Sequence, residues 1–89
     1  MYYIYVIKSQ KDDKFYIGQT NNVERRLIRH NKGMVKSTKN RRPFCLVFQE
    51  EFGTRKEAIN RETYLKSLKG GNEFKKILNK YLYSGMVQR

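Results

Sequence analysis

Two short tyrosine-containing runs near the start of the chain are the residues best placed to do chemistry. The runs are Tyr3-Ile4-Tyr5 and Tyr16-Ile17-Gly18, with ten residues between them. On two adjacent strands, Tyr5 and Tyr16 can present both hydroxyls on one face, and Gly18 leaves room for a backbone or a phosphate to approach. The alternative is that these tyrosines only pack as amphipathic core residues, as strand tyrosines often do.

A basic helix follows the second run, and two of its polar residues lie beside the expected core. On a helical wheel, Arg26 and His30 lie one turn apart and border the apolar side, whereas Arg25 and Arg29 lie on the opposite side. Arg26 and His30 could simply line the rim of the core with their apolar stems. The spacing alone favours neither a functional nor a structural role for this pair.

A carboxylate interrupts the apolar stripe of a later helix. Glu62 falls between Ala58 and Ile59 on the wheel, inside the apolar stripe, where a buried glutamate needs a partner. It could pair with Arg26 or Lys66, or it could hold one hard divalent ion. Mg²⁺ commonly takes one or two protein carboxylates and completes its shell with waters and substrate phosphates.

The elements that must position these residues follow the order strand, strand, helix, strand, helix, helix. We expect strands at 2–8, 15–19 and 44–48, the last continuing to about 52. Helices are expected from a capping box at Asn21 to about 31, from a second box at Thr54 to about 69, and from Asn72 to about 81. The predicted fold class is α+β, with a three-stranded antiparallel sheet flanked by helices. Residues 1–82 are expected to form one domain and residues 83–89 a frayed tail.

The charge of the chain indicates a polyanionic partner. Twenty basic and eight acidic residues give a net charge of +12, and four of the cations fall in one polar loop, residues 34–43. The single Cys45 excludes an internal disulfide, and one cysteine with one histidine excludes a metal cluster of these ligands. Because no long apolar run or secretory signal is visible, we expect a cytoplasmic protein that needs neither a membrane nor a small-molecule cofactor.

Taken together, these residues resemble a GIY-YIG nuclease domain. That module occurs in the protein that makes the incisions of bacterial excision repair and in certain homing and restriction endonucleases. The resemblance covers roughly residues 2–70 and is strongest to the small stand-alone bacterial members. The two tyrosine runs stand for the two name-giving motifs, Asn22, Arg26 and His30 for the first-helix motif, and Glu62 for the metal-binding glutamate. Two residues depart from the pattern: Tyr3 stands where the name implies glycine, and Gln19 where the repair proteins usually carry lysine.

The resemblance implies the GIY-YIG endonuclease fold and hydrolysis of DNA phosphodiester bonds with Mg²⁺ or Mn²⁺, in repair or recombination. It implies that Tyr16 acts as general base, that Tyr5 orients the water or the phosphate, and that Arg26 neutralises the phosphoryl charge. His30 would bond the phosphate or Tyr5, and Glu62 would hold the metal. The residues expected to bind nucleic acid are Gly18, Gln19, Asn22, Lys36, Lys39, Arg41 and Arg42. The competing interpretations are a nucleic-acid-binding module without chemistry and a basic protein bound to a ribosome or another partner.

Overall fold

The computed structural model of the chain describes the backbone of residues 1–87 and the side chains of residues 1–80. The strands are β1 (Tyr2–Ser9), β2 (Phe15–Thr20) and β3 (Phe44–Phe52), and the helices are α1 (Val23–Asn31), α2 (Arg55–Ser67) and α3 (Asn72–Val87). A short 3₁₀ turn, η1 (Lys39–Arg41), interrupts the loop before β3. The sheet has the order β2-β1-β3 and is antiparallel throughout, which confirms the predicted α+β class.

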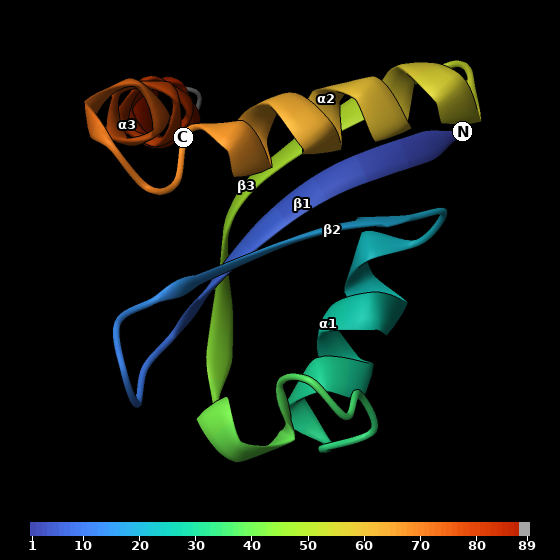
Figure 1. Cartoon of the computed structure of the whole chain (residues 1–89), viewed down its shortest axis with the longest axis vertical. Helices are drawn as coiled ribbons and strands as arrows, with labels where there is room; N and C mark the ends of the chain where they lie inside the picture. The colour runs from blue at the N-terminus through green and yellow to red at the C-terminus, as the bar shows by residue number, and fades with distance from the viewer. Residues whose placement is uncertain (88–89) are drawn as a thin grey trace.

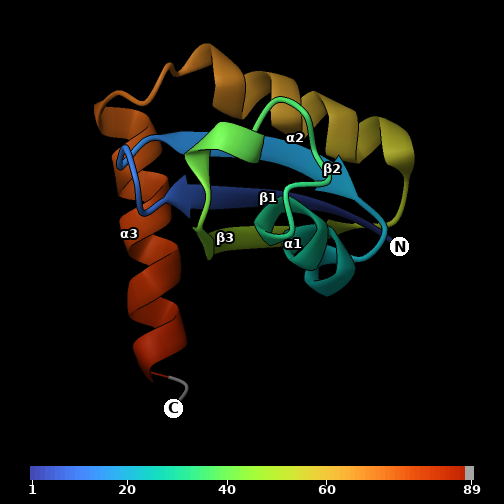
Figure 2. The same cartoon turned by 90° about the horizontal axis from the view of Figure 1, so that it is seen from below.

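The helices cover both faces of this sheet. Figure 1 shows α2 and α3 on one side of the strands and α1 on the other, and Figure 2 shows α1 lying over the sheet with α2 behind it. Because both faces are covered, the central strand β1 is buried continuously from Ile4 to Ile7. β2 and β3 form the two edges.

The side-chain alternation of the strands divides the interior into two cores. Ile4, Val6 and Phe48 pack with α2 and α3, together with Ala58, Leu65, Phe74 and Leu78. On the opposite face, Tyr5, Ile7 and Phe44 pack with α1, together with Tyr16, Val23, Leu27 and Leu46. Tyr5 and Tyr16 therefore lie on the same face, as the two-residue period of the strands predicted.

The helix starts agree with the sequence at α2 but not at α1. Thr54 accepts a hydrogen bond from the Glu57 backbone N–H at 3.2 Å, as the predicted capping box requires. The cap of α1 is Asn22 rather than Asn21, since the Asn22 side chain accepts from the Arg25 N–H at 2.9 Å. The prediction was wrong by one residue because two asparagines stand side by side and both suit a cap.

The end of the chain differs from the expectation in one respect. α3 continues to Val87, whereas the sequence predicts a helix to about residue 81 followed by a tail at 83–89. Residues 88 and 89 of that expected tail lie outside the described residues. No helix within the described part of the chain is long and apolar enough to cross a membrane.

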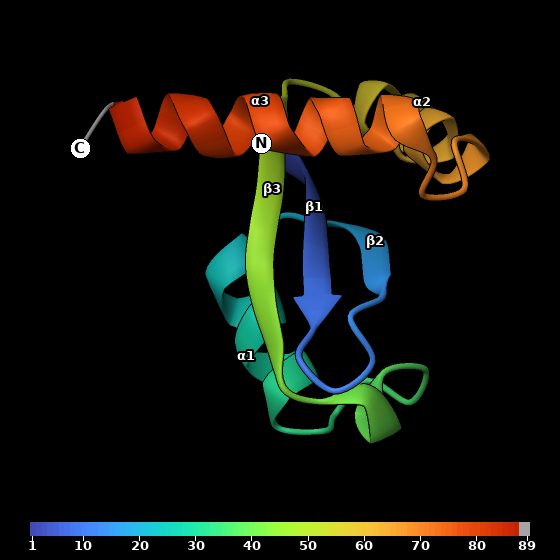
Figure 3. The same ribbon diagram turned by 90° about the vertical axis from the view of Figure 1, so that its left-hand side faces the viewer.

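The loop between α1 and β3 is fastened at its end to its neighbours. The Asn31 side-chain amide makes two hydrogen bonds to the backbone of Phe44, at 2.7 and 3.1 Å. Ser9 donates to the Arg41 carbonyl at 2.6 Å, and Arg41 Nε donates to Asp12 Oδ2 at 2.8 Å. Figure 3 shows the loop running beside the β1–β2 turn at the lower end of the sheet. The β1–β2 turn and this loop are thus held together.

Candidate active site

Tyr5 lies at the centre of a buried polar cluster on the α1 side of the sheet. It pairs with Gly18 across β1 and β2, and a Cβ added to Gly18 would lie only 2.5 Å from the Tyr5 hydroxyl oxygen. Glycine at this position therefore lets the Tyr5 ring extend across β2. The hydroxyl lies 2.8 Å from His30 Nε2 and accepts a hydrogen bond from Arg26 Nε at 3.3 Å.

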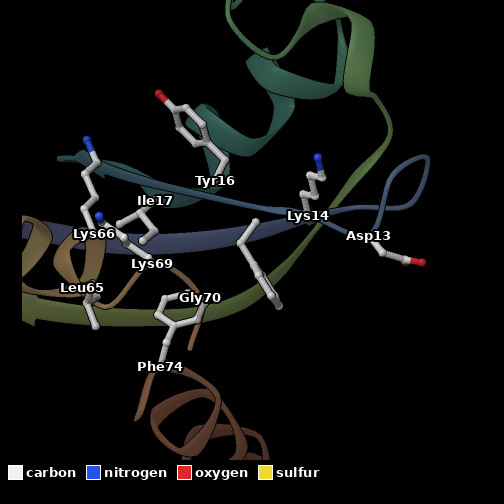
Figure 4. Close-up of a pocket in the computed structure, with 10 residues that line it drawn as sticks. Asp13, Lys14, Tyr16, Ile17, Leu65, Lys66, Lys69, Gly70 and Phe74 are labelled. Atoms are coloured by element: carbon white, nitrogen blue, oxygen red, sulfur yellow. The ribbon is translucent and has the colours of Figure 1, made fainter. Parts of the chain in front are cut away.

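Tyr16 completes this cluster on the β2 side. Its ring centroid lies 6.3 Å from that of Tyr5 and 5.0 Å from that of His30. Figure 4 shows Tyr16 pointing toward α1, whereas Ile17 points to the opposite face of β2. The hydrogen bond to Tyr5 is the main cause that raises the pKa of Arg26, and Tyr16 contributes in the same direction. Tyr5, Tyr16, Arg26 and His30 are thus brought together as predicted from their spacing.

Burial sets the protonation of the two innermost groups. His30 is fully buried, and this burial, followed by the charge of Arg26, lowers its pKa to about 4. Burial also raises the pKa of Tyr5, although the hydrogen bond and charge of Arg26 act in the opposite direction. At neutral pH the cluster therefore contains a neutral imidazole, a protonated Tyr5 and a guanidinium cation.

Glu62 approaches from the other face of the sheet. Its carboxylate binds Lys66 Nζ at 2.9 Å and its side chain is 20% exposed, so of the two partners considered from the sequence, Arg26 and Lys66, it pairs with Lys66. The charge of Glu62 nevertheless contributes to raising the pKa of Tyr5, after the larger effect of burial. Tyr16 and Lys66, the partner of Glu62, line one groove beside the edge strand β2. Glu62 does not lie on the tyrosine face itself.

The acidic residues can form only a metal site in which the protein contributes a single carboxylate. No group of three or more His, Cys, Asp or Glu side chains that could hold a metal occurs among the described residues. One carboxylate at the edge of a polar cluster is the smallest protein contribution that Mg²⁺ or Mn²⁺ accepts, and substrate phosphates and waters must then supply the other ligands. Glu62 fits that requirement if Lys66 releases it.

The residues predicted to bind nucleic acid serve different purposes. Gly18 is buried beneath Tyr5, and Asn22 uses its side chain to cap α1. Arg41 bonds to Asp12 and lies over the Phe44 ring at 5.5 Å, so its position is structural. Arg42 is exposed, but its Nε donates to the Lys39 carbonyl at 2.9 Å.

The other three residues predicted to bind nucleic acid are exposed or half-buried. Lys36 and Lys39 are exposed on the loop, and Gln19 is half-buried on β2. These two lysines are therefore the loop cations best able to contact a phosphate backbone.

Two features of this region were not predicted from the sequence. Thr38 is fully buried in the basic loop, and its hydroxyl oxygen lies 2.8 Å from His30 Nδ1. A groove of about 530 Å³ runs between β2 and the α2–α3 corner. Figure 4 shows the lysines and apolar residues of its walls, which include Lys14, Ile17, Lys66, Lys69 and Phe74. A lone threonine in a loop gives no sequence signal, and the lysines of the groove come together only through the fold.

Comparisons with known proteins place the chain in one family. The GIY-YIG catalytic domain matches residues 1–81. A UPF0213 protein of Staphylococcus haemolyticus is 43% identical over 77 residues, which are 85% of this chain and 93% of that protein. A UPF0213 protein of Bacillus subtilis is 44% identical over 68 residues, covering 75% and 68% of the two chains.

A solved structure agrees with these matches. The solution NMR structure of a UPF0213 protein from Bacillus halodurans is 33% identical and has a TM-score of 0.54. The similarity covers 90% of this chain and 84% of that one. The chain, with its two tyrosine runs on paired strands and its match to the catalytic domain over residues 1–81, belongs to the GIY-YIG family.

Proposed function

We propose that this protein is a divalent-metal-dependent endonuclease that hydrolyses phosphodiester bonds in DNA. The observation that carries the proposal is the buried pair of Tyr5 and His30, with the half-buried Arg26 bonded to Tyr5 and Tyr16 beside them. A small domain has little stability to spare, about 5 kcal/mol. Polar side chains that occupy much of one of its two cores are therefore better explained by chemistry than by packing.

The burial of Tyr5 argues against this residue as the general base, and we assign that role to Tyr16. Tyr5 is held in its protonated form, because burial raises its pKa. An unperturbed tyrosine has a pKa of about 10, so a catalytic phenolate needs a cation nearby. Arg26, next to both rings, supplies such a charge and can also neutralise the phosphoryl group as negative charge develops in the transition state.

The proposed metal site is Glu62. Mg²⁺ or Mn²⁺ bound there supplies stabilisation of the negative charge that forms on the leaving oxygen. Lys66 must give up its ion pair with Glu62, which is a half-exposed pair between residues one helical turn apart. Such pairs contribute only about 0.3–0.5 kcal/mol, so this release costs little.

Binding of the substrate is assigned to cations on two sides of the cluster. Lys36 and Lys39 extend from the loop, and Lys14, Lys66 and Lys69 line the groove beside Tyr16. Side chains of this kind position a phosphate backbone without reading its sequence. A role in repair or recombination and a cytoplasmic location, the latter based on the single free Cys45, are parts of the same proposal.

The competing function is a nucleic-acid-binding module that performs no chemistry. The cations account for binding equally well, but binding does not require a buried tyrosine–histidine pair or a carboxylate at its edge. The two functions therefore differ in what Arg26 and Glu62 are needed for.

One experiment separates these two functions. Purified protein is incubated with labelled duplex, branched, nicked and single-stranded DNA, and with RNA, in Mg²⁺, Mn²⁺ or chelator. We expect metal-dependent cleavage of DNA that is lost in Arg26→Ala and Glu62→Ala and kept in Arg25→Ala, an exposed arginine on the same helix. Tight binding without any cleavage, or full cleavage by Glu62→Ala, would contradict the proposal.

A further inference from the structure

The hydrogen bonds around Tyr5 can be satisfied in only one direction. Arg26 Nε can only donate, so the Tyr5 oxygen accepts from it at 3.3 Å. A hydroxyl oxygen can accept a second hydrogen bond, but among these neighbours only His30 Nε2, at 2.8 Å, can accept the Tyr5 proton. For Nε2 to accept, the neutral imidazole must carry its proton on Nδ1.

The same chain of bonds continues into the basic loop and ends on a carbonyl. His30 Nδ1–H faces the Thr38 hydroxyl oxygen at 2.8 Å and donates to it. The Thr38 hydroxyl proton is left to donate to the Val35 carbonyl oxygen, 3.4 Å away. In this direction every proton of the chain has an acceptor, whereas in the reverse direction the Tyr5 proton would have none among these residues. The bonds therefore favour the direction from Tyr5 through His30 and Thr38 to Val35.

Burial makes this direction consequential. Tyr5 is 1% exposed, and His30 and Thr38 are 0% exposed, so water cannot replace a missing partner without a rearrangement. All buried polar side-chain atoms among the described residues have a hydrogen-bond partner. A buried group that loses its partner costs about 1–3 kcal/mol.

We propose that Thr38 is a positioning residue that fixes the tautomer of His30 and thereby the proton and the orientation of the Tyr5 hydroxyl. Thr38 lies outside the motif residues and hydrogen-bonds to the imidazole, so it acts on Tyr5 through His30. Its effect on cleavage rests on the proposed nuclease function, whereas its effect on the tautomer is a property of the folded protein. On this proposal, the Thr38 side chain both holds the basic loop against α1 and determines which atom accepts the Tyr5 proton.

The substitution Thr38→Val isolates the hydroxyl, because valine has nearly the same shape. Without it, the proton on His30 Nδ1 has no acceptor, which favours the other tautomer. The proton on Nε2 then competes with Arg26 for the Tyr5 oxygen, and the Tyr5 proton loses its acceptor. Thr38→Ser keeps the hydroxyl and is the matched control.

The direct readout is the tautomer, measured by long-range ¹H–¹⁵N correlation spectra at neutral pH. His30 is the sole histidine, so its two ring nitrogens need no assignment against others. We expect a protonated Nδ1 and an unprotonated Nε2 in the wild type and in Thr38→Ser, and a shift toward protonated Nε2 in Thr38→Val. Protonated Nε2 in the wild type, or an unchanged tautomer in Thr38→Val, would overturn the proposal. If Thr38→Val does not fold, Thr38→Ala makes the same test, with a smaller side chain.

Cleavage supplies the second readout. We expect Thr38→Val to lower kcat about tenfold with KM unchanged, the equivalent of one hydrogen bond of about 1.4 kcal/mol, and Thr38→Ser to restore it. A wild type that cleaves nothing would refute the nuclease function and leave the tautomer result standing. A wild type that cleaves, with Thr38→Val as active as Thr38→Ser, would refute the positioning role alone.

Discussion

Acidification should destabilise the fold through His30. The pKa of this imidazole falls from 6.5 to about 4 in the folded protein, chiefly because of burial and then because of the charge of Arg26. Between those two values the unfolded chain binds a proton that the folded protein excludes, so protonation favours unfolding. The stabilising contribution is complete above about pH 6.5 and is lost as the pH falls toward 4.

The size of this effect is large for a domain of 89 residues. A difference of about 2.5 pH units, at about 1.4 kcal/mol per unit, gives about 3.5 kcal/mol. The whole free energy of unfolding of so small a domain is about 5 kcal/mol. Loss of the contribution from one imidazole should therefore remove more than half of the stability by about pH 4.

The assay is urea unfolding followed by circular dichroism at several pH values from about 7.5 down to about 4.5. Tyr5 and Arg26, which bond or lie next to the imidazole, do not titrate over this range, because burial raises the pKa of Tyr5 and the hydrogen bond to Tyr5 raises that of Arg26. The bond to Arg41 lowers the pKa of Asp12 from 3.8 to about 2, so the stability that Asp12 contributes is lost mainly below about pH 4, outside this range. His30→Gln is the control: it should be less stable at neutral pH and should lose the steep dependence on pH.

Two results would refute this reasoning. One is an equal slope of stability against pH in the wild type and in His30→Gln. The other is an imidazole resonance of the folded protein that titrates near pH 6.5, since a fully buried neutral His30 cannot do so.

Three further predictions test other parts of the structure. Gly18→Ala should destabilise the protein by about 1–3 kcal/mol in urea unfolding, because the new Cβ would lie 2.5 Å from the Tyr5 hydroxyl oxygen. Gly53→Ala is the control and should not destabilise it, because a Cβ there meets nothing within 4 Å. Equal effects of the two substitutions would contradict the close approach of Tyr5 to Gly18. Lys66→Met should raise the affinity for Mn²⁺ severalfold, measured by calorimetry, because Glu62 then no longer has a competing cation. Lys69→Met, which removes a neighbouring lysine of the groove, is the control. If Lys66→Met binds Mn²⁺ no more tightly than Lys69→Met, Glu62 is not the ligand. Replacing both Lys36 and Lys39 with alanine should weaken the binding of DNA of every sequence. The slope of the logarithm of the binding constant against the logarithm of the salt concentration should fall in magnitude by about one for each phosphate that is no longer neutralised. An unchanged slope would show that these lysines do not contact the DNA.

The strands and the shared face of the tyrosines could be predicted because both depend on local periodicity. Alternating residues on β1 and β2 point to opposite faces wherever the strand lies, so Tyr5 and Tyr16 had to meet once the strands paired. The wheel of α1 likewise placed Arg26 and His30 toward the core. It could not give the depth of His30, which depends on Thr38 and on Phe44, whose ring lies 5.9 Å away.

The separate roles of the cations in the loop before β3 could not be predicted, for a different reason. In the sequence, Lys36, Lys39 and Arg41 are equivalent cations in one polar segment. Arg41 is distinguished by its bond to Asp12, 29 residues away on the β1–β2 turn. Glu62 shows the same limit: its wheel position indicated a partner or a metal, but only the fold shows that its partner Lys66 lines a groove together with Tyr16. Pairings between residues distant in the sequence leave no local pattern.

The smaller of the two cores has a consequence for how this protein could change in evolution. Tyr5 belongs to that core, and His30 and Thr38 are buried beside it, so the residues of the proposed site also contribute to the packing of the fold. Replacing one member leaves the others without partners, whereas replacing all three with apolar residues of matching volume removes the need for any partner. A descendant that kept the fold and gave up the reaction should therefore exchange the three residues together. In related sequences, a tyrosine, a histidine and a threonine present or absent as a set would mark which chains still use this site.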